Sequence, residues 1–496
     1  MMRKEKIKSV VLAVLFITCV VFTQKLWFHL PLGGVVSLAN NDDEEINIDV
    51  TDILSPQSFI ISFGGGNHTV FYSEPYEVWN ITNPEEKKEV LIWETVKPVL
   101  KDYLKNDYEV QEVTLEEWKK IKKFKSIRMD FAFEIPEDSL TRAFSGKDNG
   151  ISEAGDSVNT ILIPGIDEEK VNIYIGNDEE NKYFKLTGMA INDEIRSLIE
   201  NIEKNVDDRN YMYYFSLKDI SDVQNDVLAP IFNETFIPSY NAINPIDVTD
   251  EVAVKSNANQ FFGKNFDFVK QITEIDGTHI YMYGYGEKAL KINRNGTLEY
   301  TEKINKENAA VNLNFLDSLE YAVKFVNDKK GWPLAVTMEN AYLSSYEPIE
   351  KEGQKGYRFS FNYRLHGLPI YIPDFGEDKG IEVEVIGTQV ISYKRRVKIA
   401  GKQLDDEIDS QKRILNILEV LNKNSNDIKN NYKSFSGKEL TEEEIKDIKI
   451  EELIEDIGLV YYSRDNVLKP VWQITIGNIV YYFDLYTGIG YTSQPK

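Results

Sequence analysis

The side chains that most often carry catalysis or bind metals are few and scattered in this sequence. Histidine occurs four times, at His29, His68, His279 and His366. None of them forms an H-x-x-x-H or H-E-x-x-H pattern, so a zinc site has little support. We expect ordinary histidines, with His68 in a turn, His279 at a strand edge and His366 beside a hairpin glycine.

Nucleophiles and metal-binding sulfur atoms are equally scarce. Cys19 is the only cysteine and lies in an apolar N-terminal run, which excludes disulfides, cysteine metal sites and a cysteine nucleophile in the rest of the chain. No G-x-S-x-G or S-x-x-K element stands in a strand–turn–helix context. The sequence therefore predicts no catalytic residue, no metal and no cofactor, and the chain is not expected to be an enzyme.

Two loops could be mistaken for ligand sites. Gly64-Gly65-Gly66 is followed by a strand and lacks G-K-[ST], so it predicts a hairpin turn and not a phosphate cradle. Asp374–Gly380 is acidic but lacks the ligand spacing of a calcium loop, so it is expected to be solvated. Carboxylate pairs for glycoside hydrolysis are numerous, and nothing in the sequence selects one.

The formal net charge of −24 restricts the partners of the chain. Nucleic-acid binding needs a cationic surface, so we expect no nucleic-acid partner. The same acidity opposes close adsorption of the folded part to anionic lipid.

The N-terminal residues 1–33 have the pattern of a membrane anchor. Four cations (Arg3, Lys4, Lys6, Lys8) precede the apolar run Val10–Phe22, and a second apolar piece extends to Leu32. A helix over Val10–Leu32 would be roughly 34 Å long, which is enough to cross a bilayer. Lys25, Trp27 and Phe28 would then anchor the far membrane interface. The basic tip predicts a cytoplasmic N-terminus, a single-pass protein of the cell membrane and an extracytoplasmic bulk.

Polar and small residues mark one part of this predicted helix. Cys19 with Thr23, and Ser9 with Ala13, have small-xxx-small spacing, and Thr18 and Gln24 add polar groups. Such residues let helices approach and hydrogen-bond in lipid, so Ala13, Thr18, Cys19, Thr23 and Gln24 are the predicted partner-binding face. The alternative is a cleaved signal peptide, with Ser37-Leu38-Ala39 as the cleavage site.

After a linker at 34–45, the chain alternates between strand and helix patterns. We predict an α+β fold with domains at 46–240, 241–400 and 401–496. The less regular expectations are a strand at Ile46–Val50, a helix over Glu89–Leu104 that Pro98 kinks or divides, loops at Phe144–Asp156 and Pro230–Pro245, and a helix over Ile408–Leu421. Capping boxes at Thr114/Glu117 and Thr441/Glu444 predict two further helix starts.

The last two domains share an order of elements. Tyr357–Ile372 and Val471–Leu485 are each an alternating strand, a glycine turn and an apolar return strand, and a helix precedes each. We interpret this as a degenerate repeat of a helix plus an antiparallel sheet.

Several segments resemble, in order, those of the YycH family of membrane-anchored regulators of the WalK-type (YycG) sensor histidine kinase of low-GC Gram-positive bacteria. The segments are Phe22–Pro31, Leu54–Ile61, Asp276–Thr278, Ala289–Ile292, Gly296–Tyr300, Tyr363–Tyr371, Ile381–Tyr393 and Pro470–Ile474. The resemblance implies an N-terminal domain followed by two related α+β domains outside the membrane. It also implies pairing with a YycI-like single-span partner, contact with the kinase through transmembrane helices, and a role in the control of cell-wall metabolism, with the sign of regulation open.

Two other functions stay open on the sequence alone. The first is an exported binding module for a cell-wall fragment or peptide, with aromatic strands (Tyr281, Tyr283, Tyr285; Tyr481, Tyr482, Phe483) forming its groove. The second is a cell-wall hydrolase, for which no catalytic constellation is apparent.

Overall fold

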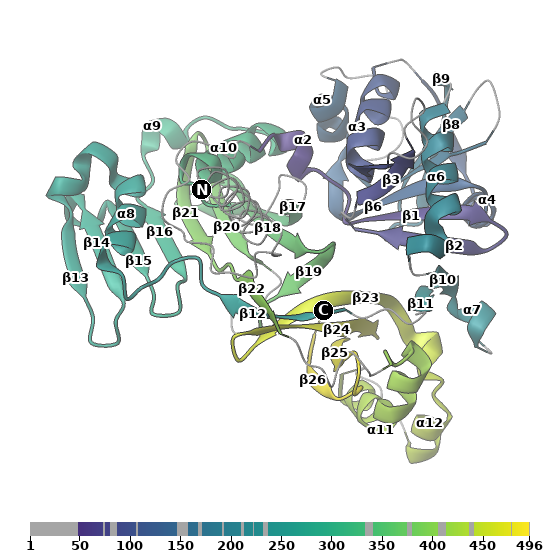
Figure 1. The fold of residues 1–496 in the computed structure, drawn as a ribbon. Coiled ribbons are helices and arrows are strands. Elements are labelled where there is room, and N and C mark those ends of the chain that lie inside the picture. Colours follow the sequence, from purple (N-terminus) through teal and green to yellow (C-terminus); the bar gives the residue numbers. More distant parts are fainter. Residues whose placement is uncertain are drawn as a thin grey trace, which may run out of the picture.

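The computed structural model describes residues 48–72, 75–79, 87–105, 108–145, 157–166, 171–190, 193–209, 213–221, 223–231, 237–332, 341–373, 379–404, 413–435, 441–477 and 479–495. The predicted tip, anchor and linker lie outside these ranges. Within the described ranges, no helix has the length and apolarity needed to cross a membrane. The described residues form a mixed α+β fold with two large sheets (Figure 1).

The first sheet has nine strands in the order β11-β10-β2-β1-β6-β7-β8-β9-β5, all paired antiparallel. Their bounds are β1 (Ser58–Gly64), β2 (Asn67–Phe71), β5 (Glu109–Val113), β6 (Ser126–Pro136), β7 (Ser157–Pro164), β8 (Val171–Asn177), β9 (Lys182–Ala190), β10 (Tyr213–Ser216) and β11 (Leu228–Ile231). A separate hairpin consists of β3 (Pro75–Trp79) and β4 (Lys87–Leu91).

Helices cover one face of this sheet because its strands alternate in polarity. Phe59 and Ile61 of β1, with Ile127 and Met129 of β6, are buried in the hydrophobic core. The helices of this part are α2 (Val50–Ile53), α3 (Ile92–Tyr103), α4 (Leu115–Ile121), α5 (Glu137–Ser145), α6 (Asp193–Arg209) and α7 (Leu217–Ile220). Of these, α6 packs on β1, β6 and β7, and α3 contacts both α5 and α6.

The second sheet has fifteen strands and runs through the rest of the described chain. Its main order is β13-β14-β15-β16-β21-β20-β18-β19-β23-β24-β12-β22, with β17 on β18 and β25 between β24 and β26. The bounds are β12 (Ser239–Ile243), β13 (Lys270–Thr273), β14 (His279–Tyr283), β15 (Lys288–Ile292), β16 (Leu298–Glu302), β17 (Ala341–Lys351), β18 (Gln354–Leu365), β19 (Leu368–Tyr371), β20 (Ile381–Ile386), β21 (Gln389–Arg395), β22 (Ile399–Leu404), β23 (Ile454–Arg464), β24 (Val467–Ile476), β25 (Ile479–Asp484) and β26 (Gly490–Pro495).

Five α-helices accompany this sheet in the described residues, namely α8 (Glu251–Phe262), α9 (Lys306–Ala309), α10 (Phe315–Asp328), α11 (Ile417–Phe435) and α12 (Glu442–Asp447). Short 3-10 turns are η2 (Gly263–Phe268), η3 (Gly284–Gly286) and η6 (Ile450–Leu453). The helix α10 begins at Asn314, whose side chain accepts from the Asp317 amide at 2.9 Å. Its buried residues Leu319, Ala322 and Val326 pack against β18, β20 and β21 (Figure 1).

Polar side chains join the first sheet to the second. The Asn327 amide accepts from the Ile48 backbone N–H at 3.2 Å and donates to its carbonyl at 3.0 Å. The buried Arg364 donates to the carbonyl of Pro56 at 2.9 Å and lies over the Tyr342 ring at 4.0 Å. At the other end, Asn225 donates to the carbonyls of Glu451 and Ile454 at 2.9 and 2.7 Å. The two sheets are therefore held together at both ends.

Most of the expected elements are present, but several boundaries are wrong. Of the predicted strand at Ile46–Val50, residues 46 and 47 lie outside the described residues, and Val50 starts α2 because Asp49 accepts from the Thr51 amide at 2.8 Å and caps the helix. Residues 87–91 form β4, so the helix expected from Glu89 starts at Ile92. Pro98 does not divide α3, whose buried residues Trp93, Val96 and Leu100 lie on both sides of it.

Two further expectations fail for local reasons. The helix expected at Ile408–Leu421 begins at Ile417, because Asn416 and Glu419 exchange backbone-to-side-chain hydrogen bonds of 2.9 and 3.0 Å. Of the expected loops at 144–156 and 230–245, residues 146–156 and 232–236 lie outside the described residues, and the described parts contain the end of α5, the end of β11 and all of β12. The domain boundaries and the repeat remain predictions, because the second and third predicted domains share one sheet.

Candidate functional site

The face of the first sheet that lies opposite its core contains a hollow lined by polar side chains. We call it the sheet hollow: a cavity of about 670 Å³ over β1, β2 and β6, bounded by α4, by the segment from β10 to β11, and by residues 455–457 of β23. Its floor carries the polar half of the strand alternation, for example Ser62 of β1 and Arg128 of β6.

Strand register places the floor residues in rows. Ser62 of β1 pairs with His68 of β2, which in turn pairs with Tyr214 of β10. In the next row, Ile60 pairs with Arg128. His68 and Arg128 thus lie on adjacent rows of the same face, two strands apart. The sequence predicts His68 in a turn, whereas the structure has it inside β2.

Arg128 is the cation at the centre of the floor. Its Nε and Nη2 both donate to Oδ2 of Asp130, at 3.1 and 2.8 Å, and Oδ1 of Asp130 accepts from Thr160 at 2.9 Å. Burial opposes the charge, but Asp130 and Asp178 raise the pKa of the Arg128 guanidinium above its usual range. The pair therefore stays charged and oriented.

For His68 and Lys122, in contrast to Arg128, the net effect of the surroundings lowers the pKa. Burial, and then the nearby Arg128 charge, lowers the pKa of His68 to about 4, so the imidazole is neutral at pH 7. Its Nδ1 is buried and makes no hydrogen bond within the described chain. Lys122 ends α4, and burial followed by Arg128 also lowers the pKa of its ammonium group.

The walls of the sheet hollow are fixed by helix capping and aromatic packing. Thr114 and Glu117 form the predicted capping box of α4, with side-chain-to-backbone distances of 3.3 and 3.0 Å. Trp118 of α4 is fully buried and stacks on Tyr183 at 4.6 Å, which places Lys122 over the floor. On the opposite wall, Asp226 accepts from Ser216 at 2.9 Å and pairs with Lys218.

The chemistry that this arrangement supports is binding, through fixed charges of both signs. His68 makes no side-chain hydrogen bond to a described residue, so it activates no hydroxyl nucleophile there. Within the described ranges, no group of three or more His, Cys, Asp or Glu side chains has the arrangement of a metal site.

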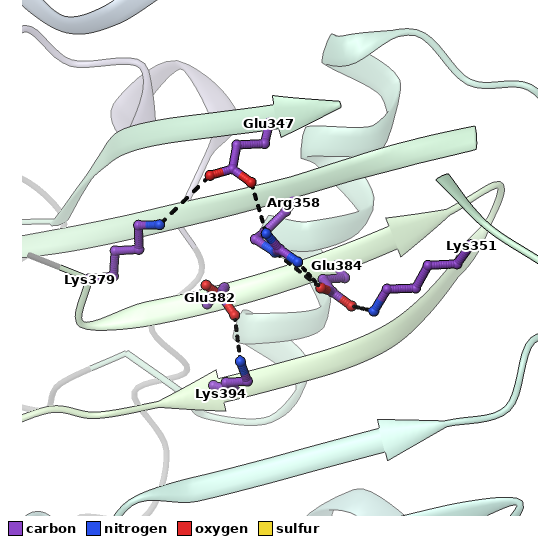
Figure 2. A network of polar contacts seen from close by, with 7 residues as sticks. All are labelled: Glu347, Lys351, Arg358, Lys379, Glu382, Glu384 and Lys394. Atoms are coloured by element: carbon purple, nitrogen blue, oxygen red, sulfur yellow. Dashed lines mark hydrogen bonds and ion pairs between the residues drawn. The ribbon is translucent and has the colours of Figure 1, made fainter. Parts of the chain in front are cut away.

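A second polar cluster lies on strands of the second sheet and is shown in Figure 2. Arg358 of β18 donates to Glu347 of β17 at 2.8 Å and to Glu384 of β20 at 2.8 and 3.0 Å. Glu384, whose side chain is 5% exposed, also pairs with Lys351, and Glu382 pairs with Lys394 at 3.0 Å. Because opposite charges on neighbouring strands are matched, this cluster stabilises the sheet.

The residues predicted to carry function are placed as follows. The predicted partner face (Ala13, Thr18, Cys19, Thr23, Gln24) and the interface anchors (Lys25, Trp27, Phe28) lie outside the described residues. His279 begins β14, and His366 lies in the turn between β18 and β19, 2.9 Å from the hydroxyl of Tyr240.

Four of the six aromatic residues predicted to form the groove of the alternative function are buried, whereas Tyr283 is half-buried and Tyr285 is exposed. Tyr481, Tyr482 and Phe483 are 4%, 0% and 3% exposed, and Tyr482 stacks on Tyr371 at 4.4 Å. Tyr281 is also buried. The three buried residues of β25, which pairs with β24 on one edge and β26 on the other, are part of the core and cannot line an open groove.

Lys122, Arg128 and His68 were not recognised as a group from the sequence. Arg128 and Asp130 occupy the polar positions of an alternating strand, which is also the pattern of a solvated face. The signal available in the sequence was one histidine and a pair of opposite charges on two strand patterns. Only the pairing of distant strands brings these residues together, and a single sequence does not show that pairing.

The comparisons with known proteins gave one finding. No family model matches the chain, and no curated protein matches it either. Among solved structures, the chain is similar to YycH from Bacillus subtilis, with a TM-score of 0.48 and 14% sequence identity over 88% of this chain and 97% of that one.

Proposed function

We propose that this chain is a non-enzymatic, membrane-anchored extracytoplasmic regulator of a sensor histidine kinase of the WalK (YycG) type. The observation that carries the proposal is the ordered series of sequence segments that resemble the YycH family, from Phe22–Pro31 to Pro470–Ile474. The segments that fall on described residues occupy defined positions: Asp276–Thr278 forms the turn between β13 and β14, and Gly296–Tyr300 leads into β16.

The proposed mechanism is a shift in the equilibrium between conformations of the kinase. A regulator helix that packs better against one kinase conformation moves the equilibrium by that difference in affinity alone. Interhelical polar contacts in membranes contribute about 0.6 kcal/mol each, so a few contacts suffice for a several-fold shift. Ala13, Thr18, Cys19, Thr23 and Gln24 are the proposed contact residues for the kinase and for a YycI-like single-span partner.

Photo-cross-linking in living membranes tests the contact directly. A photoreactive residue at position 19 or 23 is expected to capture a sensor kinase and a second single-span protein. Position 21 lies about half a turn around a helix from both, so Val21 is the matched control and should capture lipid. Equal capture from all three positions would contradict a specific helix face.

Exchange of the anchor tests whether it carries the regulation. Replacing residues 10–32 with an unrelated spanning helix should abolish regulation of the kinase while the folded part is still made and anchored. If kinase output stays regulated in that chimera, the activity belongs to the folded part and the helix is a tether.

A further inference from the structure

The sheet hollow contains cations whose hydrogen-bonding capacity is not used up within the described chain. The Arg128 guanidinium directs Nε and Nη2 to Asp130, and no hydrogen bond joins its Nη1 to a described residue. The Lys122 ammonium likewise makes no hydrogen bond or ion pair there, although the residue is half-buried. Nδ1 of His68 is buried beside them.

The cations Lys122 and Arg128 are near enough to repel one another, while His68 between the same walls is neutral at pH 7. Arg128 disfavours the charged forms of both Lys122 and His68, so all three lie within electrostatic range. Like charges held together in a partly desolvated hollow raise the free energy of the empty site. A bound anion that accepts from Lys122 and Arg128 would offset that cost.

The opposite wall selects the kind of anion. Asp226 faces the hollow from the segment between α7 and β11, where it is paired with Lys218, and the exposed Asp219 adds a second carboxylate to this wall. Both act electrostatically on His68, so they are near the cationic wall. A multiply charged phosphate or an anionic lipid surface would be repelled by these carboxylates. A ligand with one negative end and one positive end would be attracted by both walls.

The size of the hollow agrees with a small ligand. Its volume of about 670 Å³ lies within the usual range of ligand pockets, which runs from about 300 to 1,000 Å³. The walls come from α4, from the segment between β10 and β11, and from residues 455–457 of β23, so elements of both sheets enclose the site.

We propose that the sheet hollow binds a short zwitterionic peptide, with its terminal carboxylate on Lys122 and Arg128 and its ammonium group facing Asp219 and Asp226. This assignment does not depend on kinase regulation, and it gives the folded part of the chain a ligand of its own.

The test is calorimetric titration of the full chain in detergent micelles with the tripeptide Ala-Ala-Ala, which has one ammonium group and one carboxylate at pH 7. Its C-terminal amide is the matched ligand control, and inorganic phosphate is the competing anion. We expect the free acid to bind at least tenfold more tightly than the amide, and phosphate to bind more weakly than the free acid. Equal binding of acid and amide, tighter binding of phosphate, or no binding of any probe at millimolar concentration would overturn the proposal.

Variants localise the binding. Lys122→Met should weaken binding of the free acid tenfold or more, and Arg128→Met should do the same. Lys120→Met is the control, because Lys120 is an exposed residue of the same helix and does not line the hollow. Lys122 makes no side-chain bond in the described fold, so its variant should fold even if Arg128→Met does not. Unchanged affinity in Lys122→Met would refute the assignment.

Discussion

At the scale of single residues, His68 makes the stability of the first sheet depend on pH. Its folded-state pKa of about 4 lies below the ordinary value of 6.5. The unfolded chain therefore binds more protons than the folded chain between these two values. It follows that the contribution of His68 to stability is complete above about pH 6.5 and declines as the pH falls toward 4.

The expected outcome is a pH-dependent difference between the natural chain and His68→Asn. The groups that face His68 are Arg128 and Lys122, which oppose its protonation, and Asp219 and Asp226, which favour it. We expect the natural chain to lose more free energy of unfolding than the variant between pH 7 and pH 4.5. Urea denaturation of both chains at several pH values measures the difference, and parallel curves would show that His68 titrates normally.

At the scale of elements, the ion pairs of Figure 2 differ in burial although they share one arginine. The side chain of Glu384 is 5% exposed and contacts both Lys351 and Arg358, whereas that of Glu347 is 52% exposed. When the buried partner of an ion pair is removed, the remaining charges have no compensating group. When an exposed partner is removed, water can solvate the remaining charges.

Glu384→Ala is therefore expected to lower the free energy of unfolding by about 2 kcal/mol, less than for a fully buried pair because its cationic partners reach solvent. Glu347→Ala, the matched control on the same Arg358, should cost less than about 1 kcal/mol. Chemical denaturation of the two variants compares them. Similar losses would mean that burial does not decide the strength of these pairs.

The sequence predicts elements well where a local pattern decides them. The capping boxes at Thr114 and Thr441 are both present, and the alternation at Ser126–Ile135 lies within β6. The three glycines at 64–66 all have positive φ, as the predicted hairpin turn requires. These signals are confirmed because each depends on neighbours within a few residues.

The elements that the sequence missed depend on partners elsewhere in the chain. Gly401 breaks the strand pattern of the sequence within β22, so this segment is recognisable as a strand only through its pairing with β12. The helix α8 contains Ser256, Asn257 and Asn259, which favour helices weakly, and burial of Phe261 and Phe262 stabilises it. The sheet hollow was missed for the same reason, since His68 comes from β2, Arg128 from β6 and Lys122 from the C-cap of α4.

At the scale of the whole molecule, Asn225 is a bridge between the two sheets. Its side-chain amide donates to the carbonyl of Glu451 in η6 and to that of Ile454, the first residue of β23, and its Oδ1 accepts from the Val227 amide at 3.1 Å. Residues 455–457 of β23 also border the sheet hollow, so this bridge fixes one wall of that site.

Asn225→Ala should remove both contacts and loosen that wall. We expect amide hydrogen exchange at 451–457 to rise about tenfold, which corresponds to about 1.4 kcal/mol of local stability. Asn424→Ala is the control, because Asn424 bridges Val420 and Gly488 within the C-terminal part. Unchanged exchange at 451–457 in Asn225→Ala would show that the sheets are held by other contacts.

The position of β12 has a consequence for the order in which the chain can fold. This strand precedes the strands of the middle region, yet it pairs with β24, and the nearby Ile237 amide donates to the hydroxyl of Tyr486, 249 residues later. During synthesis, β12 emerges long before β24 and Tyr486 exist, and closing so large a loop is slow. The strand β24 must therefore return to the oldest strand of its sheet, and until then the edge of β12 opposite β22 is available to chaperones and proteases.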